Sequence, residues 1–230
     1  MKVLVACEFS GAVRRAFRAR GHDAWSCDLL PAEDGAPQHI QGDVRLILEQ
    51  DWDMMIAHPP CTYLAVSGFH WNYRTPGRME KTVEAIRFVE TLWAARAKRV
   101  CVENPVGILS TMSRLGRPAQ IVQPHQFGHD ASKATCLWLR GLAPLRPTCL
   151  VEGRPVMMAN GKIVRRWANQ TDSGQNRLPP SEHRAMDRSR TYPGLAEAMA
   201  ARWGENVEVW MQPELELAVS APAASPQQNA

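Results

Sequence analysis

Residues 52–67 read WDMMIAHPPCTYLAVS. The apolar run Met54–Ala57 predicts a buried strand, and the prolines at 59 and 60 prevent the chain from continuing as strand or helix. Cys61 follows at once. In an open α/β sheet, ligands bind in the crevice beyond the carboxyl ends of the strands, so a thiol at this position is a candidate nucleophile. The alternative is a small buried hydrophobe, which is what most isolated cysteines are.

The N-terminal segment predicts the opening of a nucleotide-binding βαβ unit. Residues 2–7 (KVLVAC) are typical of a strand buried on both faces, residues 12–20 favour a helix, and residues 24–27 a second short strand. Gly11 lies in the first turn, and Asp28 stands at the end of the second strand. In such units the helix N-terminus receives the ligand and the carboxylate bonds ribose hydroxyls. A structural turn explains the single glycine equally well.

Strands and helices continue to alternate downstream. The clearest predicted helix spans residues 79–98, with a core-packing stripe at Met79, Val83, Ile86, Val89 and Trp93. Residues 99–102 and 133–140 predict strands, and residues 192–203 a closing helix. Residues 67–77 are expected to form a polar, aromatic loop that could close over a substrate. This order predicts an α/β fold with a largely parallel sheet.

Polar residues also follow two other expected elements. Glu103 and Asn104 stand at a strand end before Pro105, which makes them candidate site residues. Asn104 could instead cap the segment that follows. Asp43 is suited to accept a hydrogen bond from an adenine amino group, or to act as the N-cap of a helical turn over residues 44–49.

Composition limits the class of protein. A chain of 230 residues with 45% apolar and 22% charged residues suits one globular core with a small appendage. No apolar run approaches the roughly 18 residues of a membrane span, and Glu8 interrupts the brief apolar run near the N-terminus, so no signal peptide is expected. The six cysteines form no CxxC pair, which predicts neither disulfides nor structural zinc and favours a reducing cytoplasm. His125 and His129 are interpreted as loop residues, and no metal site is predicted.

The net charge of +4 is unevenly distributed. Residues 140–190 contain ten Lys and Arg against four Asp and Glu, so all the excess positive charge lies in this segment. Such a concentration is typical of a surface that contacts nucleic-acid phosphates, although a solvated basic surface would have the same composition.

Taken in order, these motifs resemble those of the DNA cytosine-5 methyltransferases. The matching residues are Phe9, Ser10, Gly11, Asp28, Asp43, Pro59, Pro60, Cys61, Glu103, Asn104 and Lys133. The resemblance covers roughly residues 1–140 and 190–205. It implies a Rossmann-like methyltransferase fold with helices on both faces of the sheet, and S-adenosyl-L-methionine as the cofactor.

The resemblance also implies a role for each matching residue. Cys61 would add to C6 of cytosine, its thiolate favoured by nearby positive charge, and Glu103 would bind and protonate N3 with Asn104 supporting it. Lys133 stands where the family carries a basic cluster. Asp28 and Asp43 would contact the ribose and adenine of the donor, beside the first turn and the proline pair. A cytosine in duplex DNA would have to be flipped into the pocket.

The chain also departs from the family pattern. The first turn lacks additional glycines, His58 precedes the prolines, and Pro105 follows Glu103-Asn104 where the family has valine. The long target-recognition domain is absent, as in compact proteins that phages and prophages encode. The expected organisation is a catalytic core over 1–140, a short basic recognition segment over 141–190, a C-terminal helix over 191–210 that completes the core, and a disordered tail over 211–230.

Three functional hypotheses follow. The first is methyl transfer to cytosine C5 in DNA by a monomer in the cytoplasm, that of the host if the protein is phage-encoded, with no membrane partner. The second is the same chemistry on a free cytosine nucleotide, and the third is a non-catalytic nucleic-acid-binding relative. Amino-group methylation is disfavoured, because those enzymes typically have Asp or Asn before the prolines and an aromatic residue after them, where this chain has His58 and Cys61.

Overall fold

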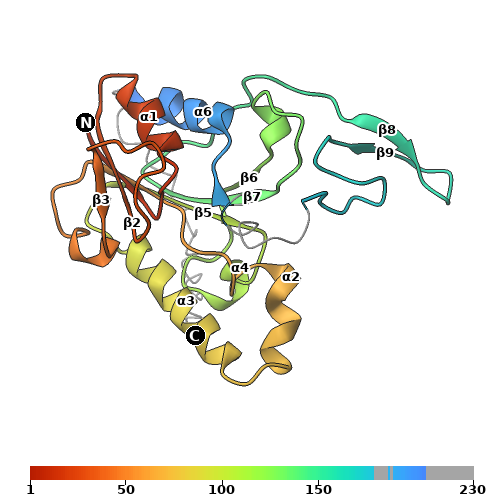
Figure 1. Ribbon diagram of the computed structural model, residues 1–230, viewed down its shortest axis with the longest axis horizontal. Helices are drawn as coiled ribbons and strands as arrows, with labels where there is room; N and C mark the ends of the chain where they lie inside the picture. Colours follow the sequence, from red (N-terminus) through yellow and green to blue (C-terminus); the bar gives the residue numbers. More distant parts are fainter. Residues whose placement is uncertain (179–185, 187–188, 206–230) are drawn as a thin grey trace, which may run out of the picture.

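The computed structural model describes residues 1–178, 186 and 189–205, and its centre is a seven-stranded sheet (Figure 1). The strand order is β3-β2-β1-β4-β5-β7-β6. The strands are β1 (Lys2–Ala6), β2 (Asp23–Asp28), β3 (His39–Gln41), β4 (Met54–Ala57), β5 (Arg99–Pro105), β6 (Gln120–Val122) and β7 (Thr135–Arg140). Strands β1 to β5 pair in parallel, whereas β7 runs antiparallel to both of its neighbours. The predicted fold class, a Rossmann-like α/β fold with a mostly parallel sheet, is confirmed.

Helices cover both faces of the sheet. The longer ones are α1 (Ala12–Arg18), α3 (Arg78–Trp93) and α6 (Pro193–Gly204), and α1 packs against α6 on the face opposite α3 (Figure 1). Single turns are formed by η1 (Val44–Leu46), α2 (Val66–Phe69), η2 (His70–Tyr73), α4 (Leu109–Met112) and η3 (Pro124–Gln126). None of the described helices is long and apolar enough to cross a membrane.

Alternation along the strands divides the core into two layers. In β1, Val3 and Val5 belong to the cluster that contains Met199 of α6, whereas Leu4 belongs to the cluster that contains Val89 of α3. Successive strand side chains point to opposite faces, so a strand covered on both sides must be apolar at every position. This explains the continuous apolar runs of β1 and β4.

Two predicted helices are shorter than expected. Helix α1 ends at Arg18 rather than residue 20, and Gly21 completes the reversal with a φ of 80°. Helix α3 ends at Trp93 rather than residue 98, because the Arg140 guanidinium donates to the carbonyls of Trp93, Ala95 and Ala97 at 2.6–2.9 Å. Those bonds hold the chain in a non-helical course up to β5.

The predicted apolar stripe of α3 is partly wrong. Val83 is 36% exposed, and the fully buried position beside it is Thr82, whose hydroxyl donates to the Arg78 carbonyl. A hydroxyl satisfied within its own helix can be buried at little cost. Ile86 and Val89 are buried as predicted.

Segments predicted to be loops contain regular structure. Residues 67–77 are not an open loop, because α2 and η2 wind most of them into helical turns and an edge-on Phe69–Tyr73 contact braces these turns. The basic segment contains an antiparallel hairpin, β8 (Arg154–Met157) and β9 (Ile163–Arg166), which extends away from the main sheet (Figure 1). Gly161, with a φ of 77°, forms its turn after Asn160, and Asn-Gly is a strong hairpin signal.

The C-terminal helix is close to its prediction. Helix α6 begins at Pro193 with Tyr192 as N-cap, and Leu195, Met199 and Trp203 are buried on one side. The predicted tail over 211–230 lies outside the described residues.

Candidate active site

The ends of β4 and β5 bring the PPC segment and the Glu103-Asn104 pair together. The two strands pair in parallel with Ala57 opposite Val102, so His58, the first residue after β4, lies beside Glu103, which is still within β5. The His58 Nδ1 atom contacts Oε2 of Glu103 directly. Next along the chain, the Asn104 Nδ2 donates to the Pro59 carbonyl at 2.9 Å. Two side-chain contacts therefore fasten the proline turn before Cys61 to the end of β5.

This arrangement corrects one expectation about Asn104. Asn104 is the sixth residue of β5, pairs with Cys136 of β7, and does not cap a helix. Its buried amide is engaged across the strands with Pro59 instead. Antiparallel β7 makes this possible, because it continues the ladder to Pro105 and holds both polar residues within the strand.

Charges of both signs surround His58. Burial opposes protonation of His58, but the carboxylates of Glu103 and Glu8 outweigh it and raise the pKa of the imidazole. Burial likewise acts to raise the pKa of Glu103, but His58 and then Lys133 outweigh it and lower that pKa. Burial dominates at Glu8 and raises its pKa despite His58 and two backbone donors. The result is a buried imidazole between two carboxyl groups that favour its protonated form, with Lys133 opposing it.

Two buried polar atoms at these strand ends have no hydrogen-bond partner within the described residues: Nε2 of His58 and Oδ1 of Asn104. The His58 side chain is only 7% exposed. Because buried polar atoms are nearly always hydrogen-bonded, each of these atoms marks a position that a ligand or ordered water would complete.

Cys61 differs from most of the other cysteines in its exposure. It is partly exposed directly after Pro60, and its carbonyl accepts from the Leu64 and Ala65 amides at 3.0 Å. Burial raises the pKa of the thiols of Cys7, Cys27, Cys101 and Cys136, to about 11 for Cys27. A buried thiol held protonated is a poor nucleophile. Cys149 is exposed, but it lies after β7, where its backbone forms an isolated β-bridge with Phe127.

A cavity of about 510 Å³ lies at the carboxyl ends of β1, β2 and β4. Its lining includes Asp28, Asp43 and Pro60, three of the residues predicted to bind the cofactor. The apolar part of the wall is made by Leu29, Val44, Tyr63, Ala85 and Phe88. Carboxylates beside an apolar wall suit a nucleoside. The carboxylates can accept hydrogen bonds from the ribose hydroxyls, and the flat base can pack against the apolar side chains.

The two aspartates are held in different ways. Asp28 accepts a hydrogen bond from the Leu30 amide at 3.0 Å. Asp43 caps η1 by accepting from the Arg45 amide, as its structural alternative predicted, and it also pairs with the Arg45 guanidinium. These hydrogen bonds lower the pKa of Asp43, so it lines the cavity as a carboxylate.

A second cavity, of about 530 Å³, lies where the first turn, β5, β7 and α6 meet the basic segment. Ser10, Lys133 and Tyr192 line it, together with Asn169 from the basic segment. Cys61 lines neither of these two cavities. The structure therefore places Asp28, Asp43 and Pro60 on the first cavity, called here the acidic cavity, and Ser10 and Lys133 on the second, whereas Glu103, like Cys61, lines neither.

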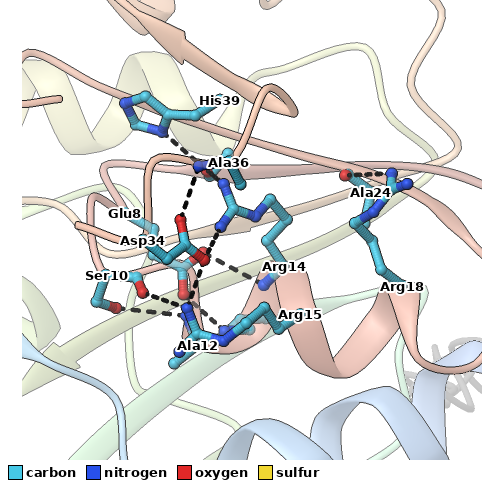
Figure 2. A network of polar contacts seen from close by, with 12 residues as sticks. Glu8, Ser10, Ala12, Arg14, Arg15, Arg18, Ala24, Asp34, Ala36 and His39 are labelled. Carbon is cyan, nitrogen blue, oxygen red and sulfur yellow. Dashed lines mark hydrogen bonds and ion pairs between the residues drawn. The ribbon is translucent and has the colours of Figure 1, made fainter. Parts of the chain in front are cut away.

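The first turn is shaped by a buried polar network (Figure 2). Glu8 accepts from the Val13 and Arg14 amides at 2.6 and 3.3 Å and thereby caps α1. The Arg14 guanidinium, 1% exposed, donates to Ser26 and to Asp34, and Arg15 also pairs with Asp34. These bonds attach the segment after β2 to the start of α1.

The Phe9-Ser10-Gly11 turn faces this network and the second cavity. Gly11 has a φ of 67°, and a Cβ there would lie 2.2 Å from the Arg14 guanidinium, so only glycine fits. Phe9 is buried beneath the Arg190 guanidinium, 5.9 Å from its ring centre, and Ser10 lines the second cavity. None of the three lines the cavity that contains Asp28.

The sequence does not single out His58 and Glu8 as candidate site residues, although both contact or face the cluster around Glu103. For His58 a signal exists, because a histidine after one strand and a glutamate in the next can meet. For Glu8 the signal is weaker, because a buried helix-capping carboxylate looks like an exposed turn residue in sequence.

His125 and His129 have structural contacts. His125, in η3, stacks on Trp167 at 4.0 Å, and the His129 Nε2 accepts from the Gly194 amide at 2.9 Å. No group of three or more His, Cys, Asp or Glu that could hold a metal occurs among residues 1–178, 186 and 189–205.

Comparisons with known proteins find similarity only among solved structures. No family model matches the chain, and no curated protein does. One similar structure is described as a DNA modification methyltransferase encoded within a prophage of E. coli (15% identity, TM-score 0.43, 66% of this chain and 52% of that one). Another is the Entamoeba histolytica methyltransferase EhMeth (14% identity, TM-score 0.43, 66% and 58%). The chain thus spans just over half the length of these proteins.

Proposed function

We propose that the protein transfers a methyl group from S-adenosylmethionine to C5 of cytosine in DNA through a covalent adduct with Cys61. The observation that carries this proposal is the joining of two strand ends: His58 contacts Glu103, and Asn104 holds the Pro59 carbonyl. A nucleophile and an acid for the same ring must come from neighbouring positions. The fastening of the segment that bears Cys61 to the strand that bears Glu103 supports these two residues as that pair.

The residue types match the chemistry. The Cys61 thiolate forms a bond to C6, the π pair of C5–C6 moves to C4–C5, the π pair of C4–N3 moves onto N3, and N3 uses that pair to take a proton from Glu103. S-adenosylmethionine, when bound, supplies an electrophilic methyl group to C5, and its carbon–sulfur bond pair leaves with sulfur. Loss of the C5 proton to water and of the Cys61 thiolate from C6 restores the ring, and the N3 proton returns to Glu103.

The acidic cavity supports the choice of donor. Asp28 would bind the ribose hydroxyls and Asp43 the adenine amino group, with the base between Val44 and Phe88. The cavity meets the proline turn through Pro60, one residue before Cys61. A donor held there would direct its sulfonium end toward the turn that bears the nucleophile.

The basic segment supports DNA as the acceptor. Its hairpin presents Lys162 at an exposed turn and Arg165 on β9, and a two-stranded ribbon fits a DNA groove. The second cavity lies between this segment and Lys133, where an extruded nucleotide would pass to reach Glu103.

The test is transfer of labelled methyl groups to DNA by the wild-type protein and by Cys61→Ala, followed by mass spectrometry of the nucleosides. We expect 5-methyldeoxycytidine from wild type and none from the variant. If wild type transfers no label, or if Cys61→Ala transfers as much as wild type, the proposal is wrong.

A free cytosine nucleotide is the second candidate acceptor, because a cavity of about 530 Å³ has the volume of a small-molecule site. Parallel assays with dCMP and with an oligonucleotide distinguish the two. A strict requirement for polymer would eliminate the nucleotide, whereas equal rates on both would indicate that the basic segment is unnecessary for the reaction.

A further inference from the structure

His58 has no role in the methyl-transfer steps proposed above. It contacts the carboxyl group of Glu103, the residue assigned to protonate N3. Its ring lies between strand ends, and its side chain is 7% exposed against 9% for Glu103. Solvent therefore has little direct access to the carboxyl group that must gain and release a proton in each cycle.

Glu103 by itself lacks a proton to give to N3 when it is ionised. Burial opposes the charge on both groups, but each group favours the charged form of the other, which raises the pKa of His58 and lowers the pKa of Glu103, so the shared proton favours the imidazole over the carboxylate. An ionised carboxylate accepts hydrogen bonds and cannot protonate N3. The nearest group able to give it a proton is the imidazolium in contact with it.

We propose that His58 holds the proton that Glu103 delivers to N3 of the target cytosine, so that the two side chains act as one proton-bearing pair. This inference rests on the function proposed above. As Cys61 adds to C6, the proton on His58 Nδ1 moves to Oε2 of Glu103, and a proton on the Glu103 carboxyl passes to N3. When Cys61 leaves, both transfers reverse, so neither residue gains or loses a proton over the cycle.

The surroundings of His58 suit this role. The charged groups that face it are Glu8 from the turn after β1, Glu103 from β5, and Lys133 from the segment before β7. Glu8 is fixed by the Val13 and Arg14 amides, so it favours the imidazolium by its charge while its oxygens remain committed to capping α1. Lys133 opposes the imidazolium and favours ionised Glu103. The unpartnered Nε2 of His58 leaves one ring position for a substrate atom or water.

The first arm of the test is the pH dependence of kcat/KM for methyl transfer, in wild type and His58→Gln. Glutamine can still donate a hydrogen bond to Glu103 but cannot supply a proton. We expect kcat/KM to fall about 100-fold at pH 8, as for loss of general acid catalysis, with the alkaline limb displaced to lower pH and donor affinity unchanged. His125→Gln, a histidine stacked on Trp167 outside this cluster, is the matched control and should keep the wild-type profile. A His58→Gln loss that is equal at every pH, or no loss, would overturn the proposal.

The second arm does not depend on activity. Nitrogen-15 NMR of the unliganded protein should show that the pKa of His58 lies above the ordinary histidine value, and Glu103→Gln should lower that pKa. A His58 titration that Glu103→Gln leaves in place would refute the pairing even if the protein methylates DNA. The remaining outcome is a His58 pKa that does depend on Glu103 in a protein that methylates no DNA. This result would refute the proposed function, and with it the delivery of a proton to cytosine N3, although the His58–Glu103 pairing itself would stand.

Discussion

Removing the carboxylate of Asp34 should destabilise the fold more than its position in a surface segment suggests. Its Oδ2 lies 2.5 Å from an Arg14 guanidinium that is 1% exposed, and Asp34→Ala would leave that cation buried with Ser26 as its remaining side-chain partner (Figure 2). Breaking a buried ion pair from one side costs about 3–5 kcal/mol. The Asp34 side chain is 27% exposed, so in the variant water can replace some of its hydrogen bonds to Arg14. We therefore expect a loss of about 3 kcal/mol in the free energy of unfolding. At 2–4 °C per kcal/mol this lowers Tm by about 6–12 °C.

Urea denaturation measures the free energy of unfolding, and two further variants test the reason. Asp34→Asn keeps a neutral acceptor and should lose about 1 kcal/mol. Arg14→Met combined with Asp34→Ala removes the stranded cation and should recover at least about half of the loss. If Asp34→Ala costs less than about 1 kcal/mol, or if the double variant is no better than the single one, the buried charge is not what makes Asp34 important.

The same pair has a defined pH dependence. Burial acts to raise the pKa of Asp34, but the hydrogen bonds from Arg14 and Arg15 outweigh it and hold the pKa well below its ordinary value. A carboxyl group whose pKa is depressed by folding stabilises the protein above its unfolded pKa, and this contribution is lost as the pH falls. The stability difference between wild type and Asp34→Ala should therefore shrink progressively as the pH falls below the ordinary aspartate pKa of about 4, and it should close only where Asp34 becomes protonated in the folded protein.

Four further substitutions should change ligand binding or stability in a defined direction. Asp28→Ala removes a carboxylate from the acidic cavity and should weaken S-adenosylmethionine binding by about 10- to 100-fold in calorimetry, as loss of a charged hydrogen bond predicts. Asn104→Ala frees the Pro59 carbonyl and should cost about 1–2 kcal/mol in urea denaturation, with a larger relative loss of methyl transfer. Met199→Ala empties a fully buried position of α6 and should cost about 2–5 kcal/mol, read as a lower thermal midpoint. Lys162→Ala at the hairpin turn should reduce the slope of log K for DNA against log salt by about 0.9 and leave the sequence preference unchanged.

The fold was predictable because strands that are covered on both faces consist of continuous runs of apolar residues. The runs at residues 2–7 and 54–57 need no long-range information, and the spacing of Ile86 and Val89 identifies a helix with one buried face. The ends of helices were less predictable. The termination of α3 depends on Arg140, 47 residues beyond Trp93, whose guanidinium takes the carbonyls that would otherwise continue the helix. The antiparallel direction of β7 also leaves no local signal, because an apolar strand reads the same in both directions.

The candidate site was predictable where its residues lie at the carboxyl ends of parallel strands. Asp28, Pro60 and Glu103 lie at or near the carboxyl ends of β2, β4 and β5, and the parallel sheet brings such ends to one edge. Contacts between those ends were harder to foresee. The His58–Glu103 contact requires the register of β4 against β5, and the Asn104–Pro59 bond requires an asparagine that stays inside a strand. The expected grouping of Phe9, Ser10 and Gly11 with the acidic cavity could not account for Arg14 and Asp34, which occupy the space beside Gly11.

The central claim is a sulfur–carbon bond between Cys61 and the cytosine ring, and the most direct measurement is covalent trapping. A DNA duplex containing 5-fluorocytosine allows addition and methyl transfer, but fluorine cannot leave as a cation, so the adduct cannot resolve. With S-adenosylmethionine present, intact mass spectrometry should find a protein–DNA complex whose peptide map assigns the link to Cys61, and Cys61→Ala should form none. A complex linked through another residue, or methylated DNA without any trapped complex, would contradict the account.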